Sequence, residues 1–433
     1  MRSPVPEYVH EILDLCAAGD RGELADYIPQ LAAVNPELLA VALCTPDGTI
    51  YSAGDTDHRF TIQSISKPFA YALALEDHGK EEILRHVDVE PSGDAFNSIS
   101  LEEGTGRPEN PMINIGAITV HSLIGEERLS GEERADRLIA KMGDFAGRTL
   151  EVDEAVFASE LEESWRNLAL ANLAKAVGTL RGDPAEAVRG YIRCCAVTVD
   201  VEDLAMMAIT LASDGINPRT GEQVVPEWVA RQVLSVMTSC GMYDAAGDWL
   251  STVGIPAKSG VAGGILGALP GQVGIGTFSP RLDRFGNSVR GVRMFERLSN
   301  DMGLHLMRTP PPSIDAIGQR SRTRDGRRLI RLQGGLTFAT AELALRHFQH
   351  IPTDDTDVVV DFTLVPRIEE VGARMIHEGL ERLANDGHSV ILVDPHGRVA
   401  EAGDMWLDDE DADSPEYRPE EYIDRVVGKR EEI

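Results

Sequence analysis

The sequence contains no long apolar run. None of its 433 residues lies in an uninterrupted apolar stretch of roughly 18 positions, the length that a membrane-spanning helix needs. The opening residues, MRSPVPEYVHEILDL, lack both an apolar core and a small-residue cleavage site, so we do not expect them to act as a secretory leader. From these absences we expect no membrane association and a cytoplasmic protein.

Positive charge is scarce. Lysine and arginine total 41, against 71 aspartates and glutamates, which gives a formal net charge of −30. Nucleic acids and anionic membrane surfaces are bound through lysine and arginine, and a strongly acidic chain repels both. Nucleic acid is therefore not an expected partner.

Cysteine and histidine patterns are also sparse. The five cysteines are odd in number and form no C-x-x-C, so they predict reduced, buried thiols rather than a disulfide framework or a zinc site. The eleven histidines include no H-E-x-x-H. We therefore expect no metal and no cofactor. The cysteines are Cys16, Cys44, Cys194, Cys195 and Cys240.

The first three hundred residues change their hydrophobic period twice. They predict a helix over 7–17, two strands within 38–55, a helix-rich middle from 64 to 245, Gly- and Val-rich strands after 250 and a last helix ending near 306. Pro46-Asp47-Gly48 is a strong hairpin turn between the first two strands. This order predicts an α+β domain over 1–306, with a mostly antiparallel sheet whose first and last strands are neighbours, a helical lobe, and a cleft between them.

The rest of the chain has a different pattern. Residues 307–327 contain three consecutive prolines and a basic run, which predict a linker. Residues 328–433 alternate strand-like and helix-like segments, which predict a small α/β domain, with an acidic tail after Gly403. The second helix of this domain should bury its apolar face, which carries Val371, Met375, Ile376, Leu380 and Leu383.

The segment FTIQSISKPFAYALALEDHG, residues 60–79, places Ser64 three residues before Lys67. Residues at this spacing share one face of a helix, and Pro68 favours a helix that starts near Ser64 because proline is tolerated in the first turn. A serine there lies at the positive end of the helix dipole, and a desolvated lysine can act as its base. Ser66 lacks the spacing and is interpreted as a packing residue. Alone, S-x-x-K also fits a solvent-facing lysine on an ordinary helix.

A second motif strengthens the chemical interpretation. Lys258-Ser259-Gly260 lies in a strand-like segment late in the domain. S-x-x-K followed by K-[ST]-G is typical of serine β-lactamases and penicillin-binding proteins. Together the two motifs predict an acyl-transfer enzyme with a serine nucleophile.

Longer runs identify a family. In order along residues 7–306 the chain contains ADYIPQLA, GDTDHRFTIQSISKPFAYALALEDHG, EPSGDAFN, NPMINIGAI, SCGMYDAAGDW and PAKSGVAGGI, and it resembles the serine-dependent glutaminases. The resemblance implies a β-lactamase-like fold and hydrolysis of L-glutamine to L-glutamate and ammonia (EC 3.5.1.2 type) through a γ-glutamyl acyl-enzyme. It also implies a homodimer or homotetramer.

The resemblance further implies roles for individual residues. Ser64 would be the nucleophile, Lys67 its base, and Tyr243 the group that assists proton transfer to departing ammonia. The backbone N–H groups of Ser64 and Val261 would form the oxyanion hole. Lys258, Ser259 and Gly260 would support the site. The residues that would bind substrate are Tyr27, Gln63, Ser64, Asn114, Glu160, Asn167, Tyr191, Tyr243 and Val261.

Glutamine's own chemistry fits that set. The carboxylate of Glu160 suits the α-ammonium, and the uncharged donors Asn114, Asn167 and Tyr191 suit the α-carboxylate. Taken singly, these residues would be solvated helix positions or half-buried aromatics. One departure is Cys195-Ala196, where the family usually has Cys-Ser, and we expect it to alter substrate positioning without abolishing activity.

The C-terminal domain is similar to the STAS fold of anti-sigma-factor antagonists, through VVVDFTLVPRIEEVGARMI. In those regulators an Asp-Ser precedes the helix and the serine is phosphorylated, whereas this chain has Glu369-Glu370. Without a hydroxyl to modify, we expect a constitutive docking or oligomerisation module with a protein partner. A solvated helix N-terminus with no further role is the plain alternative.

Two other functions fit parts of the sequence. A β-lactam-interacting serine hydrolase would share both motifs, but such enzymes are exported and no leader is seen. A regulatory binding protein would use the C-terminal domain and carry an inert first domain. The complete set of Ser64, Lys67, Tyr243 and the Lys258-Ser259-Gly260 motif favours the enzyme.

Overall fold

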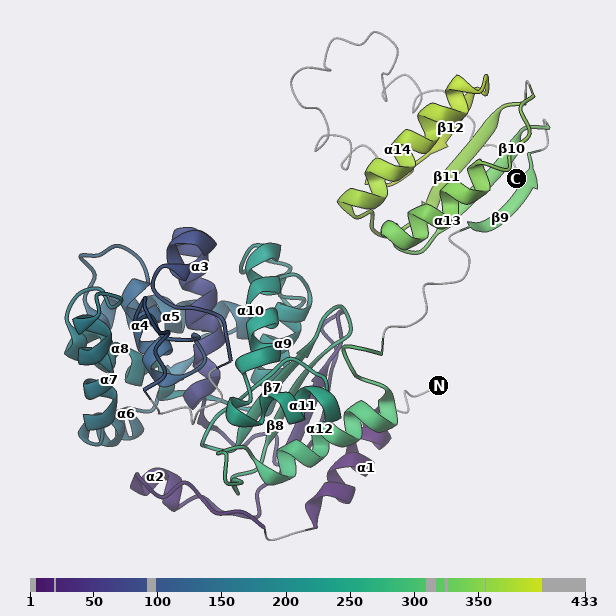
Figure 1. Ribbon diagram of the computed structural model, residues 1–433. Coiled ribbons are helices and arrows are strands. Elements are labelled where there is room, and N and C mark those ends of the chain that lie inside the picture. The colour runs from purple at the N-terminus through teal and green to yellow at the C-terminus, as the bar shows by residue number, and fades with distance from the viewer. Residues whose placement is uncertain are drawn as a thin grey trace. The chain divides into compact units, whose positions relative to one another are not determined.

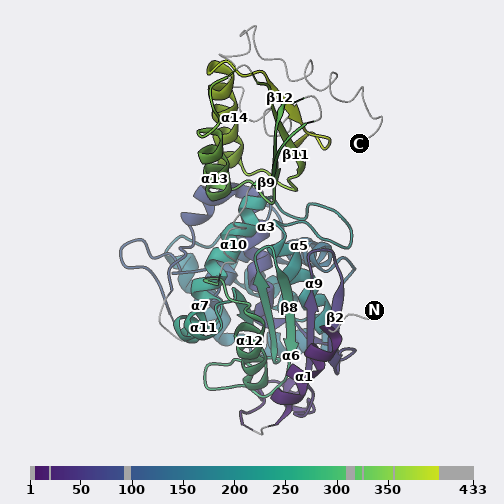
Figure 2. The same ribbon diagram turned by 90° about the vertical axis from the view of Figure 1, so that its right-hand side faces the viewer.

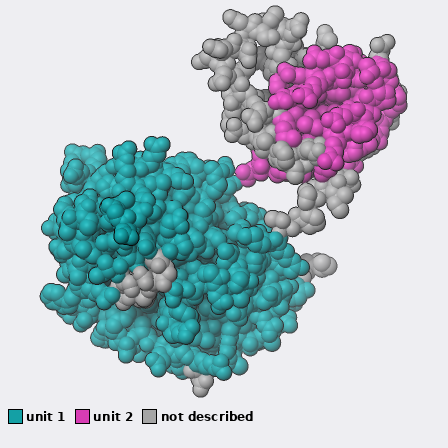
Figure 3. All heavy atoms as spheres, in the orientation of Figure 1, with its two compact units in different colours: residues 1–308 teal, residues 309–433 magenta. Residues whose placement is uncertain are grey.

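The computed structural model describes residues 5–18, 21–91, 99–308, 317–323, 326–354 and 356–398 (Figure 1). The chain divides into two compact units, residues 1–308 and 309–433 (Figure 3). In the described part of either unit, no helix is both long and apolar enough to cross a membrane.

The first unit is built on a five-stranded antiparallel sheet in the order β2-β1-β8-β7-β6. The prediction that the first and last strands are neighbours is confirmed, because Ala42 of β1 lies opposite Gly276 of β8. The predicted hairpin turn is also present, with Gly48 at φ 83° and its N–H bonded to the carbonyl of Thr45. The strands are β1 Ala40–Cys44, β2 Ile50–Gly54, β6 Ala257–Ser259, β7 Gly264–Leu269 and β8 Val273–Phe278.

Both faces of this sheet are covered, which explains why β1, β7 and β8 are buried along their whole length. Alternate residues point to opposite faces, so Val41 and Leu43 pack with α1 (Val5–Ala17) and α12 (Val289–Met302). Ala40, Ala42 and Cys44 face the other core, which contains α9 (Val201–Ala212).

Glycines let α9 approach the sheet closely. A Cβ at Gly274 would lie 2.3 Å from the carbonyl oxygen of Ala205, and one at Gly276 would lie 2.2 Å from that of Val201. Only glycine fits where two backbones come so near. This contact fixes the helical lobe against β8.

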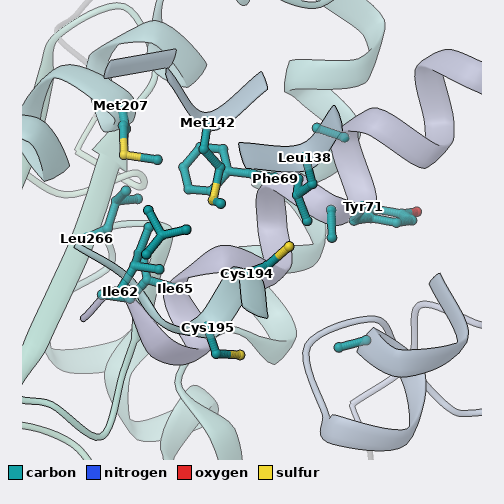
Figure 4. Packing of buried hydrophobic residues seen from close by; sticks show 14 of the residues in the cluster. Ile62, Ile65, Phe69, Tyr71, Leu138, Met142, Cys194, Cys195, Met207 and Leu266 are labelled. Carbon is teal, nitrogen blue, oxygen red and sulfur yellow. The ribbon is translucent and has the colours of Figure 1, made fainter. Parts of the chain in front are cut away.

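The helical lobe lies to one side of the sheet in Figure 1, and α1 and α12 lie to the other. Its interior includes the edge-to-face pair Phe69 and Phe145, with ring centroids 4.9 Å apart. Figure 4 shows Phe69 packed in this core with Leu138, Met142 and Met207. The other helices of the unit are α2 Pro29–Ala32, α3 Lys67–Leu84, α4 Asn114–Leu123, α5 Gly131–Ala146, α6 Glu154–Glu162, α7 Trp165–Ala176, α8 Pro184–Cys195, α10 Glu227–Cys240 and α11 Ala246–Thr252.

Short elements join the lobe to the sheet. A small sheet orders β3 (Phe60–Thr61), β5 (Val197–Val199) and β4 (Glu151–Val152). Directly after β3 comes the 3-10 turn η1, Gln63–Ser66, and the turn η2, Tyr243–Ala245, precedes α11. η1 carries Gln63 and Ser64, and η2 carries Tyr243.

The second unit is a four-stranded sheet in the order β12-β11-β10-β9, with α13 and α14 together on one face (Figure 2). β10, β11 and β12 are parallel, as the alternating pattern predicts. Ile376, Leu380 and Leu383 of α14 are buried and Met375 is partly buried, as expected; the side chain of Val371 lies outside the description. The elements are β9 Ile317–Arg322, β10 Arg328–Gln333, α13 Phe338–Phe348, β11 Val358–Leu364, α14 Glu370–Asn385 and β12 Val390–Val393.

The structure differs from the expected linker over 307–327 at one point. Residues Ile317–Arg322 form β9, which pairs antiparallel with β10. Charged residues on an edge strand protect it from pairing with further strands. In β9 they also leave no alternation of apolar and polar residues, because Ile317, which is buried, is the one large apolar residue of the strand. The prolines of the predicted linker and the acidic tail lie outside the described residues, as does most of EPSGDAFN.

Candidate active site

Ser64 and Lys67 lie where η1 continues into α3. The backbone N–H of Lys67 donates to the carbonyl of Ser64, and Pro68 occupies the first turn of α3. The predicted helix start is therefore confirmed. Ser64 is 8% exposed and Lys67 only 1%, so the solvent-facing alternative for Lys67 does not hold.

Burial changes the protonation of Lys67. Loss of water around the ammonium lowers the pKa of Lys67 to about 8, against about 10.4 for a free lysine. Its Nζ donates to Oδ1 of Asn114 at 2.7 Å. With a pKa near 8, about a tenth of the molecules carry a neutral Lys67 at pH 7, and a neutral amine can accept a proton.

Ser64 is hydrogen-bonded to Tyr243. The Tyr243 hydroxyl donates to the carbonyl oxygen of Ser259 at 3.0 Å, so in its bond with Ser64 it is the acceptor and the Ser64 hydroxyl is the donor. Burial raises the pKa of Tyr243 to about 12, against the opposing effect of these hydrogen bonds. The Lys67 ammonium donates to Asn114, and Ser64 bonds to Tyr243.

Two residues at the site have left-handed backbones. Gln63 has φ 51° and Tyr243 has φ 56°, a conformation that side chains other than glycine adopt at an energetic cost. Both immediately flank the Ser64 hydroxyl, one along the chain and one through its hydrogen bond. The surrounding packing holds this strain in place.

Glu160 on α6 is the anionic residue of the site. The hydroxyl of Tyr27 donates to Oε1 of Glu160 at 2.7 Å, and Nε2 of Gln63 donates to the same oxygen at 3.1 Å. Burial raises the pKa of Glu160, and the two hydrogen bonds oppose that rise. Although Tyr27 is 46% exposed, burial around its hydroxyl and the charge of Glu160 raise the pKa of Tyr27.

Amide and phenol groups complete the arrangement. Nδ2 of Asn114, at the start of α4, donates to Oδ1 of Asn167 on α7 at 3.2 Å. Tyr191 on α8 is buried and hydrogen-bonded to the Cys195 thiol, whose pKa burial raises to about 11. Cys195 Sγ also lies 3.8 Å from Oγ of Ser66, which accords with a packing role for Ser66.

The second motif lies beside η1. A Cβ at Gly260 would be 2.9 Å from the carbonyl oxygen of Ile62, so glycine is what permits β6 to end next to the Ser64 turn. The Ser259 hydroxyl donates to Oδ1 of Asn287 at 2.5 Å. Val261 follows Gly260, and in the described part of the chain its N–H makes no backbone hydrogen bond.

Electrostatic interactions show that these groups form one site. The pKa of Tyr191 is raised first by burial and then by neighbours that include Tyr243 and Glu160. The pKa of Tyr27 also responds to Tyr243, and that of Lys258, lowered mainly by burial, responds to Lys67. The structure thus connects predicted side chains that come from five α-helices, two 3-10 turns and a strand.

Sequence reasoning missed three contacts. Thr61 accepts a hydrogen bond from Gln63, Cys195 contacts Ser66 and Tyr191, and Asn287 anchors Ser259. The position after Cys195 had been noted only as a departure, and Ala196 is fully buried. No pattern in the sequence pointed to Asn287, because its link to Ser259 depends on the fold.

A separate surface hollow lies on the other side of the sheet. It has a volume of about 590 Å³ and is open to solvent along α1, where Pro6, His10 and Leu15 are among its lining residues. α1 packs on the sheet face opposite α9. The hollow therefore contains none of the site residues.

Comparison with known proteins agrees with this arrangement. The glutaminase family model matches residues 22–307, and the STAS domain model matches residues 320–406. A glutaminase of Corynebacterium glutamicum is 50% identical over 393 residues, which cover 90% of this chain and 94% of that protein. Glutaminase 2 of Bradyrhizobium diazoefficiens is 42% identical and covers 94% of this chain, which in turn spans 67% of that protein.

Solved structures show the same likeness. The crystal structure of Mglu matches with a TM-score of 0.87 at 49% identity, over 92% of this chain and 99% of that one. The probable glutaminase ybaS matches with a TM-score of 0.68 at 39% identity, over 70% of this chain and 98% of that one. The chain therefore belongs to the glutaminase family, with a STAS domain after its glutaminase domain.

Proposed function

We propose that this glutaminase hydrolyses L-glutamine to L-glutamate and ammonia, with Ser64 as nucleophile and Lys67 as base. The observation that supports the proposal most is the buried pair itself. Ser64 hydrogen-bonds to Tyr243, while burial brings the pKa of Lys67 to about 8. A serine beside a phenol and a partly neutral lysine has the groups that acyl transfer needs.

In the acylation step, Ser64 Oγ attacks the side-chain carboxamide carbon of glutamine and its proton passes to Lys67. The proton held by Lys67 then passes through Tyr243 to the substrate nitrogen, the C–N bond of the tetrahedral intermediate breaks, and ammonia leaves. In the second step Lys67 takes a proton from the water that attacks the γ-glutamyl ester, and this proton passes to Ser64 Oγ as the ester C–O bond breaks and L-glutamate is released. The N–H groups of Ser64 and Val261 would stabilise the oxyanion, an interaction worth a few kcal/mol per donor.

Substrate recognition follows from the charges of the site. Glu160 would pair with the α-ammonium, because Tyr27 and Gln63 both bond to Oε1 and orient the carboxylate. Asn114, Asn167 and Tyr191 would donate to the α-carboxylate without adding charge. The related Mglu has been solved in a glutamate form, which supports glutamine and glutamate as the substrate and product of this chain.

For the second unit we propose a constitutive docking or oligomerisation role. Glu369 occupies the N-cap position of α14 and makes no side-chain capping bond, and no hydroxyl is present at 369–370 to be phosphorylated. A homodimer or homotetramer stays a prediction. Light scattering of the full chain and of a chain lacking residues 309–433, together with a pull-down on the full chain, tests the role. An unchanged oligomer and no recovered partner would refute it.

The catalytic proposal is tested by ammonia release from L-glutamine by the wild type and by Ser64→Ala. L-asparagine and a chromogenic β-lactam serve as competing substrates. Ser66→Ala, in the same turn, is the matched control and should retain turnover within about tenfold, because the Ser66 hydroxyl donates to the carbonyl oxygen of Gln63 at 2.8 Å and contacts Cys195 and so supports the turn rather than the reaction. Glutamine turnover that survives in Ser64→Ala would refute the nucleophile, and cleavage of the β-lactam alone would favour the other hydrolase.

A further inference from the structure

Lys258 is a fully buried lysine at the edge of the site. It lies on β6 and is 0% exposed. Its Nζ donates to the carbonyl oxygen of Ser259 at 2.9 Å and lies 3.9 Å from the centre of the Tyr243 ring. Nζ of Lys258 thus packs over the face of the phenol ring and also bonds to the carbonyl that accepts from the phenol.

The same carbonyl oxygen accepts from two side chains. The Tyr243 hydroxyl donates to the carbonyl oxygen of Ser259 at 3.0 Å. Nζ of Lys258 donates to the same oxygen. The Ser259 hydroxyl is in turn tied to Asn287. The phenol is thus held at its oxygen by Ser259 and at its ring by Lys258.

The backbone of Tyr243 is strained, so neighbouring groups must hold the residue in place. Its φ of 56° lies in a region that disfavours residues with a Cβ, and such conformations persist only where the surroundings fix them. A small rotation of the ring would move the hydroxyl away from Ser64. Holding that ring is therefore a condition for the Ser64–Tyr243 hydrogen bond.

We infer that Lys258 is a positioning residue: it holds the phenol of Tyr243 against the Ser64 hydroxyl so that Tyr243 can pass a proton to the departing nitrogen. The inference rests on the proposed function, since it gives Lys258 a role in that same reaction. Lys258 acts through Tyr243 and does not itself touch the reacting atoms.

The cost of burying this lysine supports a functional reason for it. An apolar side chain of similar volume would fill the space without desolvating an ammonium. Burial lowers the pKa of Lys258 well below its usual range, and the nearby Lys67 lowers it further, with Cys195 acting in the opposite direction. Lys67, Cys195 and Tyr243 are the titratable groups that face it.

The test compares Lys258→Met with Lys141→Met. Lys141 is a matched control because its Nζ also donates to a backbone carbonyl, that of Val224 at 2.8 Å, but it lies on α5 away from Tyr243. We expect Lys258→Met to lower kcat by about 10- to 100-fold with KM within about threefold, and Lys141→Met to change neither by more than about threefold.

A double-mutant cycle separates positioning from a general structural effect. Tyr243→Phe should lower kcat by at least about tenfold in the wild type but by less than about threefold in Lys258→Met, because the phenol is already misplaced there. Equal losses in both backgrounds would overturn the inference, as would a Lys258→Met enzyme with wild-type kcat. Should Lys258→Met not fold, Lys258→Gln, which keeps a donor for Ser259 but no cation, takes its place in the same cycle with the same outcomes.

A second readout does not depend on turnover. With 13C-labelled tyrosine, the ring signal that disappears in Tyr243→Phe is identified as Tyr243. That signal should shift in Lys258→Met and stay in place in Lys141→Met. If the wild type is active but the Tyr243 signal does not move in Lys258→Met, the positioning role is wrong and the proposed function stands. If the wild type releases no ammonia but the signal does move in Lys258→Met, only the proposed function is wrong.

Discussion

Nζ of Lys67 donates a 2.7 Å hydrogen bond to Oδ1 of Asn114. Asn114 is an acceptor here, so the bond stabilises the ammonium form of a lysine that burial otherwise drives toward the neutral form. Burial lowers the pKa of Lys67 to about 8. The protonation state of Lys67 therefore affects both the free energy of unfolding and the turnover of the enzyme.

The first prediction concerns the pH dependence of turnover. If Lys67 is the base, kcat at saturating L-glutamine should rise as the pH increases through about 8, since only the neutral amine accepts the Ser64 proton. Asn114→Leu removes the acceptor and should shift this midpoint to lower pH. A profile of kcat against pH for both enzymes measures the shift, and a midpoint that stays unchanged in Asn114→Leu would contradict the link.

Lys67→Met should separate activity from stability. Turnover should fall by at least about a thousandfold, because no other group takes the proton. A lysine whose folded pKa is lowered costs stability at every pH below its unfolded value, on the order of 3 kcal/mol here. We therefore expect a higher free energy of unfolding for Lys67→Met at pH 7 by urea denaturation. A variant that is both inactive and less stable would show that Lys67 is needed for folding instead.

Glu160→Gln tests recognition of the α-ammonium. The amide keeps the size of the side chain but loses the charge that would pair with the substrate, so KM for L-glutamine should rise by about 100-fold while kcat changes much less. Glu162→Gln, exposed at the end of the same helix, should behave as the wild type. Steady-state kinetics of the pair decide the point, and a kcat loss without a KM change would assign Glu160 to the chemical step.

His121 should make the first unit sensitive to acid. It is 1% exposed, and burial, together with the charge of Arg134, lowers its pKa to about 3. Among the described residues its ring nitrogens bond to no partner. Because the unfolded chain binds the proton near pH 6.5 and the folded chain does not, stability is lost as the pH falls below about 6.5, by about 1.4 kcal/mol per unit.

The measurement is the free energy of unfolding at pH 7.5 and pH 5. His121→Leu should remove about 2 kcal/mol of the difference between the two pH values. The exposed His10→Leu serves as control and should retain the full difference. An equal pH dependence in all three proteins would exclude His121 as the cause.

The two units have separate hydrophobic cores, so a core mutation should act on one of them only. Leu380→Ala on α14 removes a buried side chain from the core of the second unit and should lower the stability of that unit by about 3 kcal/mol. Glutamine turnover should be unchanged. Calorimetry with an activity assay checks both, and loss of activity in Leu380→Ala would show that the second unit regulates the first.

The sequence predicted more of the fold than of the contacts within the site. The hairpin at Pro46-Asp47-Gly48, the helix start at Ser64 and the parallel strands of the second unit follow from local patterns, and the structure has all three. β9 was not predicted, because an edge strand rich in arginine lacks the alternation of apolar and polar residues that indicates a strand. The contacts of Thr61 with Gln63, of Cys195 with Ser66 and of Asn287 with Ser259 were not predicted. Thr61 and Cys195 lie in segments that the sequence singles out, but nothing in those segments indicates these contacts, and nothing near Asn287 marks it.

By itself the sequence determined the local conformations and the chemical inventory of this protein. Proline in a first turn, glycine in a hairpin and the spacing of Ser64 and Lys67 act over a few residues, where sterics and hydrogen bonding decide the backbone. Only the tertiary structure decided which groups meet: Lys67 with Asn114, 47 residues away, Ser64 with Tyr243, and Lys258 with the ring of Tyr243. Those contacts depend on how helices and sheet pack, and the same packing removes the water that would otherwise hold both lysines at their ordinary pKa.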